Sequence, residues 1–89
     1  MKDFSVRIVS KDIINGEPLA TCAVTTYDNR YFATVRYNYF TNDCKAIDLI
    51  DSADIQLLFG IKTLDEYDTL IALMYVSVFD TISKGIMSN

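Results

Sequence analysis

Apolar and polar residues alternate along the first forty residues of the chain. In the stretch DFSVRIVS, Phe4, Val6 and Ile8 fall on one face, and the residues between them are polar or basic. A period of two is typical of a half-buried β-strand. Two further alternating segments follow, EPLATCAV and residues 31–38. The pattern predicts three antiparallel strands joined as a meander.

A tight turn is expected between the first two strands. Asn15-Gly16 separates KDII from EPLATCAV, and this dipeptide favours a type I′ turn because both central residues need a positive φ. Pro18 donates no backbone hydrogen bond, so the chain near it is expected at a sheet edge or unpaired.

The register of the strands is predicted from the face on which apolar residues gather. A two-residue turn sets Ile8 opposite Ala23, and a three-residue loop in YDNRY sets Ala23 opposite Val35. We prefer that loop to a two-residue one because a slip of one residue exchanges the faces of a strand. The expected packed face contains Phe4, Val6, Ile8, Ala23, Tyr27, Tyr31, Ala33, Val35 and Tyr37. The opposite face keeps the apolar residues Val9, Val24 and Phe32, a first indication of a partner.

A helical period replaces the alternation after residue 42. Ala46, Ile50, Ala53 and Leu57 are spaced by four, three and four, which predicts a helix from about residue 43 to about residue 59 with a break near residues 51–52. Gly60 then supplies a left-handed stop.

A second helix is expected from residue 63 to about residue 85. Thr63-Leu64-Asp65-Glu66 matches a capping box, in which the Thr oxygen accepts the Glu66 N–H and the Glu side chain reaches back. We therefore predict an α+β fold, a three-stranded antiparallel β-meander followed by two α-helices packed on one face of the sheet. With 89 residues, the chain is expected to form a single domain, residues 1–89.

The second helix is apolar on nearly every side. The apolar stripe that is expected to pack against the sheet contains Tyr67, Leu70, Ile71, Met74, Tyr75, Val78 and Ile82. Four further apolar residues fall largely outside this stripe: Leu64, Leu73, Val76 and Phe79. Each contributes about 1.5–3 kcal/mol if buried. Two coverings are considered, the first helix packed alongside, and a partner that is a second copy or a host protein.

Charge is distributed unevenly. The net charge is −4; residues 1–40 carry four acids and five bases, whereas residues 41–89 carry eight acids and three bases. Asp48, Asp51 and Asp54 are expected along one flank of the first helix, and Asp65, Glu66 and Asp68 at the start of the second. Three interpretations of these acids are possible: a solvated face whose acids suit the helix dipole, a docking surface for a basic partner, or a cation site. Carboxylates three residues apart on a helix point in different directions, whereas a cation site needs them to converge on one point.

No catalytic, cofactor or metal motif is found. The chain has no His, no GxSxG, no glycine-rich phosphate loop and no CxxC, so we expect no enzyme and no bound cofactor. Cys22 and Cys44 are expected to be reduced thiols. Cys44 would lie in the first turn of a helix, where the dipole lowers a thiol pKa.

Membrane and nucleic-acid partners are not expected. The longest uncharged run, residues 69–79, is shorter than the ~18 residues of a spanning helix, and MKDFSVRIVS lacks the apolar stretch of a signal peptide. A cytoplasmic location follows. Arg30, Phe32 and Arg36 are expected to point outward, too few groups to attract phosphates to a chain of net charge −4.

A protein interface is therefore the expected working surface. An acidic, motif-free chain rich in Asn, Asp, Ile and Tyr suits small phage or mobile-element proteins that inhibit host enzymes. We predict an inhibitor or adaptor of a host nucleic-acid-processing complex; the alternatives are a self-associating structural subunit (a homodimer, for example) and a weak single-stranded nucleic-acid binder. The predicted interface residues are Asp48, Asp51, Asp54, Asp65, Glu66, Asp68, Leu73, Val76 and Phe79.

Overall fold

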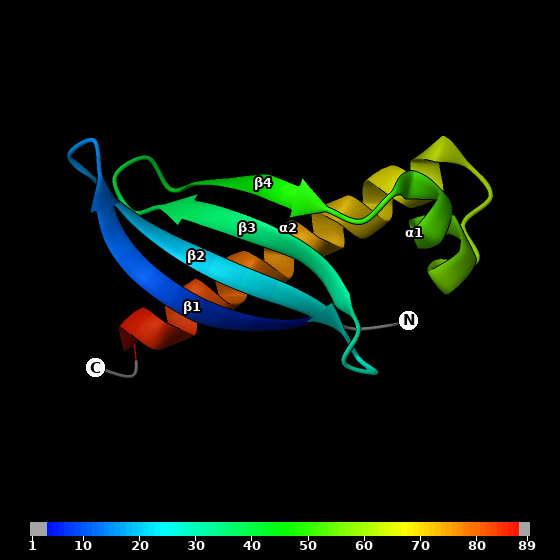
Figure 1. The fold of residues 1–89 in the computed structure, drawn as a ribbon, viewed down its shortest axis with the longest axis horizontal. Coiled ribbons are helices and arrows are strands. Elements are labelled where there is room, and N and C mark those ends of the chain that lie inside the picture. The colour runs from blue at the N-terminus through cyan, green and yellow to red at the C-terminus, as the bar shows by residue number, and fades with distance from the viewer. Residues whose placement is uncertain (1–3, 88–89) are drawn as a thin grey trace.

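A computed structural model describes residues 4–87 as a four-stranded antiparallel sheet with two helices (Figure 1). The strands lie side by side in chain order. The α+β class is confirmed, and the sheet has one more strand than the sequence predicted. The elements are β1 (Phe4–Ile14), β2 (Glu17–Thr26), β3 (Tyr31–Asn38), β4 (Asp43–Leu49), α1 (Ser52–Phe59) and α2 (Leu64–Met87).

The turn between β1 and β2 is the two-residue turn that the sequence predicts. Ile14 pairs with Glu17, and the residues between them, Asn15 and Gly16, have φ values of 53° and 79°. Both central residues lie in the left-handed region, as a type I′ turn requires.

Gly16→Val is expected to lower the free energy of unfolding by more than about 1 kcal/mol, because a β-branched residue at positive φ is strained. Gly85→Ala is the control, since Gly85 is helical and an added Cβ would meet only the Ile8 side chain, at 3.9 Å. Chemical denaturation measures both variants. A Gly16→Val protein as stable as the parent would contradict the turn.

A β-bulge in β1 changes the predicted register. Ser10 pairs with Thr21 as the turn dictates, but the pairing shifts at Val9, so that Ile8 lies opposite Cys22. The prediction that Ile8 lies opposite Ala23 is therefore wrong, because a bulge inserts one unpaired residue. The buried residues of β2 are Ala20, Cys22, Val24 and Thr26, and Ala23 belongs to the other face.

A second bulge lies at the start of β3. The loop from Tyr27 to Arg30 has four residues, Thr25 pairs with Tyr31, and Val24 pairs with Ala33, which leaves Phe32 unpaired between them. Phe32 is fully buried, so its predicted outward position is wrong. Tyr27 and Tyr31, which were expected on the packed face, are exposed.

Residues 43–49 form a strand where the sequence predicted the start of a helix. Tyr37 pairs with Cys44 and Val35 with Ala46, so this segment extends the sheet beyond β3. The helix α1 begins at Ser52, close to the predicted break, and ends at Phe59. The next residue, Gly60, has a left-handed φ of 65°, as predicted. The Ile61 N–H closes this end by donating to the Gln56 carbonyl at 3.1 Å.

The helix α2 begins at the predicted capping box. The Glu66 N–H donates to Thr63 Oγ1 at 3.2 Å, and Glu66 Oε1 accepts the Lys62 N–H at 3.3 Å. The helix runs to Met87, slightly past the predicted end at Gly85. Its N-terminus is thereby fixed by the Thr63–Glu66 pair.

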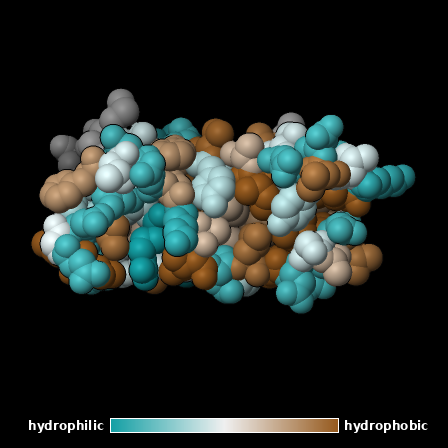
Figure 2. All heavy atoms as spheres, turned by 90° about the horizontal axis from the view of Figure 1, so that it is seen from above, coloured by the Kyte–Doolittle hydropathy of each residue, from teal (hydrophilic) through white to brown (hydrophobic). Residues whose placement is uncertain are grey.

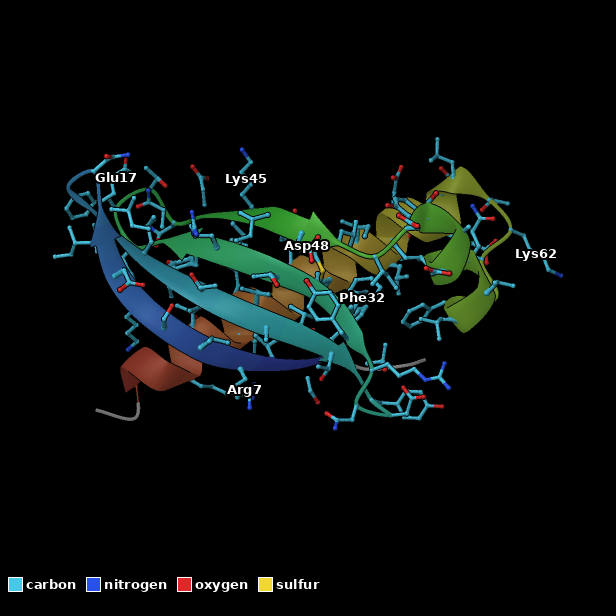
Figure 3. All side chains as sticks on the ribbon, in the orientation of Figure 1. Arg7, Glu17, Phe32, Lys45, Asp48 and Lys62 are labelled. Atoms are coloured by element: carbon cyan, nitrogen blue, oxygen red, sulfur yellow. The ribbon has the colours of Figure 1, made fainter. Side chains whose placement is uncertain are left out.

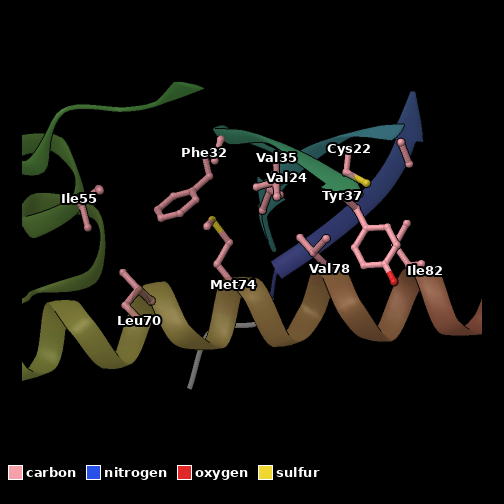
Figure 4. Close-up of a cluster of buried hydrophobic side chains, with 12 residues drawn as sticks. Cys22, Val24, Phe32, Val35, Tyr37, Ile55, Leu70, Met74, Val78 and Ile82 are labelled. Atoms are coloured by element: carbon pink, nitrogen blue, oxygen red, sulfur yellow. The ribbon is translucent and has the colours of Figure 1, made fainter. Parts of the chain in front are cut away.

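The core lies between one face of the sheet and α2 (Figures 1 and 4). Met74 and Val78 of α2 are fully buried against sheet residues. In Figure 1, only α2 runs along the sheet, whereas α1 lies beyond its end. The buried cluster comprises Ala20, Cys22, Val24, Phe32, Ala33, Val35, Tyr37, Ile55, Leu70, Met74, Val78 and Ile82. The opposite face of the sheet is uncovered by either helix.

Candidate protein-binding surface

Apolar side chains are exposed on α2 outside the stripe that packs against the sheet. Val76 is 61% exposed and Phe79 38%, and Leu73 is partly buried. These three are successive i, i+3 neighbours, so their side chains follow one another along the helix. The Phe79 ring also contacts the Tyr37 ring edge-on, with centroids 5.8 Å apart.

The first helix does not cover this row. The helix α1 lies beyond the end of the sheet (Figure 1), and it exposes an apolar residue of its own, Leu57, by 83%. Leu64 at the start of α2 is 74% exposed. In the view from above, apolar side chains reach the surface over the centre and the α1 end of the molecule (Figure 2). The covering by α1 that the sequence allowed is thus not what the structure shows.

Asp48, Asp51 and Asp54 do not form the predicted helix flank. Asp48 lies in β4 (Figure 3), Asp51 precedes α1 as its N-cap, and Asp54 is in the first turn of α1. Extended backbone replaces the helix around Asp48, and a strand spaces residues differently from a helix. The Tyr31 hydroxyl donates to Asp48 Oδ2 at 2.5 Å; burial and this hydrogen bond raise the pKa of Tyr31.

Asp65, Glu66 and Asp68 do cluster, at the start of α2, and all three are exposed. Asp65 and Glu66 lie in the first turn, where carboxylates are stabilised by the positive end of the helix dipole. Glu66 also serves the cap. Asp68 has no such role in the described contacts, which makes it the carboxylate best suited to test docking.

The two thiols lie inside the fold. Cys22 is fully buried in β2, and burial raises its pKa. Cys44 is partly buried in β4 rather than in the first turn of a helix, and burial raises its pKa to about 11. The predicted lowering by a helix dipole is therefore wrong, because the residue is in a strand.

Alkylation of Cys44 by iodoacetamide at pH 8 is expected to be slow in the folded protein. Only the thiolate reacts, and a pKa of about 11 leaves the thiol protonated at that pH. Urea-unfolded protein provides the control and should react at the rate of an ordinary cysteine, with a pKa of about 8.5. Mass spectrometry follows both reactions. Equal rates would show that Cys44 is exposed as a normal thiol.

The uncovered face of the sheet mixes charges of both signs. The register places Arg7, Ala23, Thr34 and Asp48 in one row across the four strands. In Figure 3, Arg7 and Lys45 project from the outer strands of the sheet. Asp48 interrupts the basic residues of this face, and the exposed Tyr31 hydrogen-bonds to Asp48 and Thr34 of the same row.

An open pocket that the sequence did not reveal lies where α1 is joined to α2. It has a volume of about 570 Å³, and its lining includes Phe59, Ile61, Leu70 and Leu73. Phe59 and Ile61 flank Gly60, and the apolar residues beside a helix stop were the available signal, since such residues often pack across the stop.

The described residues form neither a metal-binding cluster nor a membrane-spanning helix. Within residues 4–87, no group of three or more His, Cys, Asp or Glu side chains is placed to hold a metal ion. In that part of the chain, no helix has the length and apolar character needed to cross a membrane. The chain matches no family model, no curated protein and no solved structure.

Proposed function

We propose that the protein is a small acidic protein-binding module, an inhibitor or adaptor of a host nucleic-acid-processing enzyme or complex of the phage or mobile-element type. The observation that carries this proposal is the apolar row on α2, in which Val76 and Phe79 are exposed and Leu73 is partly buried. Neither α1 nor the described part of the sheet covers Val76.

Contiguity is what distinguishes this row from ordinary surface residues. Single exposed apolar residues are common on proteins, but apolar neighbours on one helix side resemble the apolar centre of an interface. Burying such side chains contributes about 1.5–3 kcal/mol each. A chain of 89 residues has little stability to spare, so a surface of this kind is best explained by a partner.

The negative charge at the start of α2 supports a basic partner. Exposed Asp65, Glu66 and Asp68 lie on the same helix as the apolar row. Acidic surfaces accelerate encounter with basic ones, and enzymes that handle nucleic acids carry basic tracks for phosphates. This complementarity is the support for a nucleic-acid-processing partner.

Affinity capture from host cells, with mass spectrometry to name the partner, supplies the material for the test. Asp68→Lys is then expected to slow association by about threefold or more and to weaken its salt dependence. Asp12→Lys, the same charge change near the Asn15-Gly16 turn, is the matched control and should associate at the wild-type rate. Equal behaviour of the two variants would contradict acidic docking at α2.

Two alternatives give different results. A self-associating subunit would show a mass above that of the 10.1 kDa chain in sedimentation. A single-stranded nucleic-acid binder would shift an oligonucleotide in a low-salt gel, and Arg7→Glu would abolish the shift. If no partner protein is captured and one of these results is obtained, the corresponding alternative function replaces the proposal.

A further inference from the structure

The pocket between α1 and α2 combines an apolar floor with an acidic rim. Phe59 and Ile61 come from the end of α1 and the loop after it, and Leu70 and Leu73 come from α2. Asp65 and Glu66 line the same pocket and are exposed. Its volume of about 570 Å³ falls within the ~300–1,000 Å³ of typical ligand pockets.

The floor of the pocket is held by the core. The Phe59 ring lies 5.8 Å from the Phe4 ring and 5.7 Å from the Phe32 ring, between centroids. Leu70 belongs to the buried cluster. These side chains cannot fold into the opening without leaving the core, so the pocket is preformed, which lowers the entropic cost of binding.

The walls are held by the two helix ends. Gly60 turns the chain at the end of α1, and the Ile61 N–H bonds the Gln56 carbonyl. On the other side, the Thr63–Glu66 cap fixes the start of α2. The loop that carries Ile61 is therefore held by hydrogen bonds at both of its ends.

The chain segment that joins α1 to α2 and supplies part of the pocket lining is strongly acidic. The segment from residue 51 to residue 68 holds five carboxylates, Asp51, Asp54, Asp65, Glu66 and Asp68, and one cation, Lys62. The ion pairs found among the described residues, Arg30–Asp28 and Lys84–Asp80, involve none of these five. Glu66 Oε1 also accepts the Lys62 N–H in the cap, whereas Asp65 and Asp68 are exposed and can attract a cationic ligand.

We propose that this pocket binds an amphipathic segment of a partner protein, which inserts an apolar side chain between Phe59 and Leu73 and sets Lys or Arg residues against Asp65 and Glu66. The inference rests on the proposed function and gives it a site and a ligand chemistry. Helix-in-groove recognition of this type uses apolar anchors at i, i+3 and i+4 spacing.

Charge separates this occupant from the others. Nucleic acids and anionic lipid surfaces are repelled by the acidic rim. In a symmetric pair formed through this pocket, a second copy of the chain would bring its Asp65 and Glu66 against the same two residues, which costs binding energy. A basic polypeptide gains from both the floor and the rim.

The test uses two fluorescein-labelled peptides of about 15 residues, built from leucine and lysine or from leucine and glutamate with the same helical period. Fluorescence anisotropy with the whole chain measures affinity. The lysine peptide is expected to bind at least about tenfold more tightly than the glutamate peptide, and salt should reduce the difference.

Thr69 provides the variants, because it lines the pocket and is exposed on α2. Thr69→Lys should weaken binding of the lysine peptide by about threefold or more, and Thr69→Glu should strengthen it. Thr41→Lys, the same charge change in the exposed loop after β3, is the control and should leave the affinity within about twofold.

Four outcomes would overturn the proposal. Equal affinity for the two peptides would mean apolar adhesion without charge recognition. Equal effects of Thr69→Lys and Thr41→Lys would mean attraction by net charge alone. Self-association that Thr69→Lys disrupts would make a second copy the occupant. The fourth outcome is that neither peptide binds. If binding of a captured partner still depends on Val76, the proposed function then stands at another surface. If that dependence is absent too, both the pocket proposal and the proposed function are wrong.

Discussion

Phe32→Ala is expected to lower the free energy of unfolding by about 3–5 kcal/mol, as large aromatic truncations in cores do. Phe32 is fully buried, with its ring centroid 4.7 Å from that of Phe4 and 5.7 Å from that of Phe59. The substitution removes the ring that joins β1 to the end of α1. Denaturant unfolding followed by circular dichroism measures the loss.

Phe40→Ala is the matched control, because Phe40 is 70% exposed in the turn after β3. Its effect is expected to stay within about 0.5 kcal/mol, the range of ordinary surface substitutions. A cost below about 1 kcal/mol for Phe32→Ala would place this side chain on the outer face, as strict alternation in β3 predicts, and would remove the bulge.

Local signals were enough to predict most of the elements. Asn15-Gly16 specifies its own turn through positive φ, and Thr63 with Glu66 specifies the start of α2 through hydrogen bonds within one turn. The stripe from Leu70 to Ile82 needs only one sheet to pack against. Each of these signals is confined to a few residues or to one period, so the rest of the fold hardly alters it.

The two bulges could not be predicted because they depend on the match between strands. Strict alternation leaves Val24 and Phe32 on the outer face, and the structure returns both to the core by shifting the register at Val9 and at Phe32 itself. Apolar residues on a face that should be polar were the warning. Burying them is worth more than an unbroken ladder.

The fourth strand was missed because two periods compete in one segment. Ala46 and Ile50 fit a helix, but Cys44 and Ala46 also alternate with Lys45 and the exposed Ile47. Pairing with β3 decides between them, since β3 would otherwise be an open edge. Because this pairing makes residues 43–49 a strand, Asp48 is separated from Asp51 and Asp54, and the predicted acidic helix flank does not form.

Val76→Lys is expected to leave the protein folded and to weaken association with its captured partner by at least about tenfold, and Val78→Lys is expected to unfold it. The two residues have the same side chain and lie two positions apart on α2, but Val76 is 61% exposed and Val78 is fully buried. A lysine at Val78 would place an unpaired charge in the core, a cost of about 4 kcal/mol or more that a small domain does not survive. At Val76 the same lysine stays in water and costs about 0.5 kcal/mol or less.

Circular dichroism and thermal melting establish which variants are folded, and biolayer interferometry with the captured partner measures affinity. Val76 is the cleanest position in the apolar row, because Phe79 also contacts Tyr37 and Leu73 also lines the pocket. A folded Val76→Lys protein with wild-type affinity would show that the partner does not bind the outer side of α2. Unfolding of Val76→Lys would instead show that the side chain is covered within the chain itself, and the row would lose its meaning as an interface.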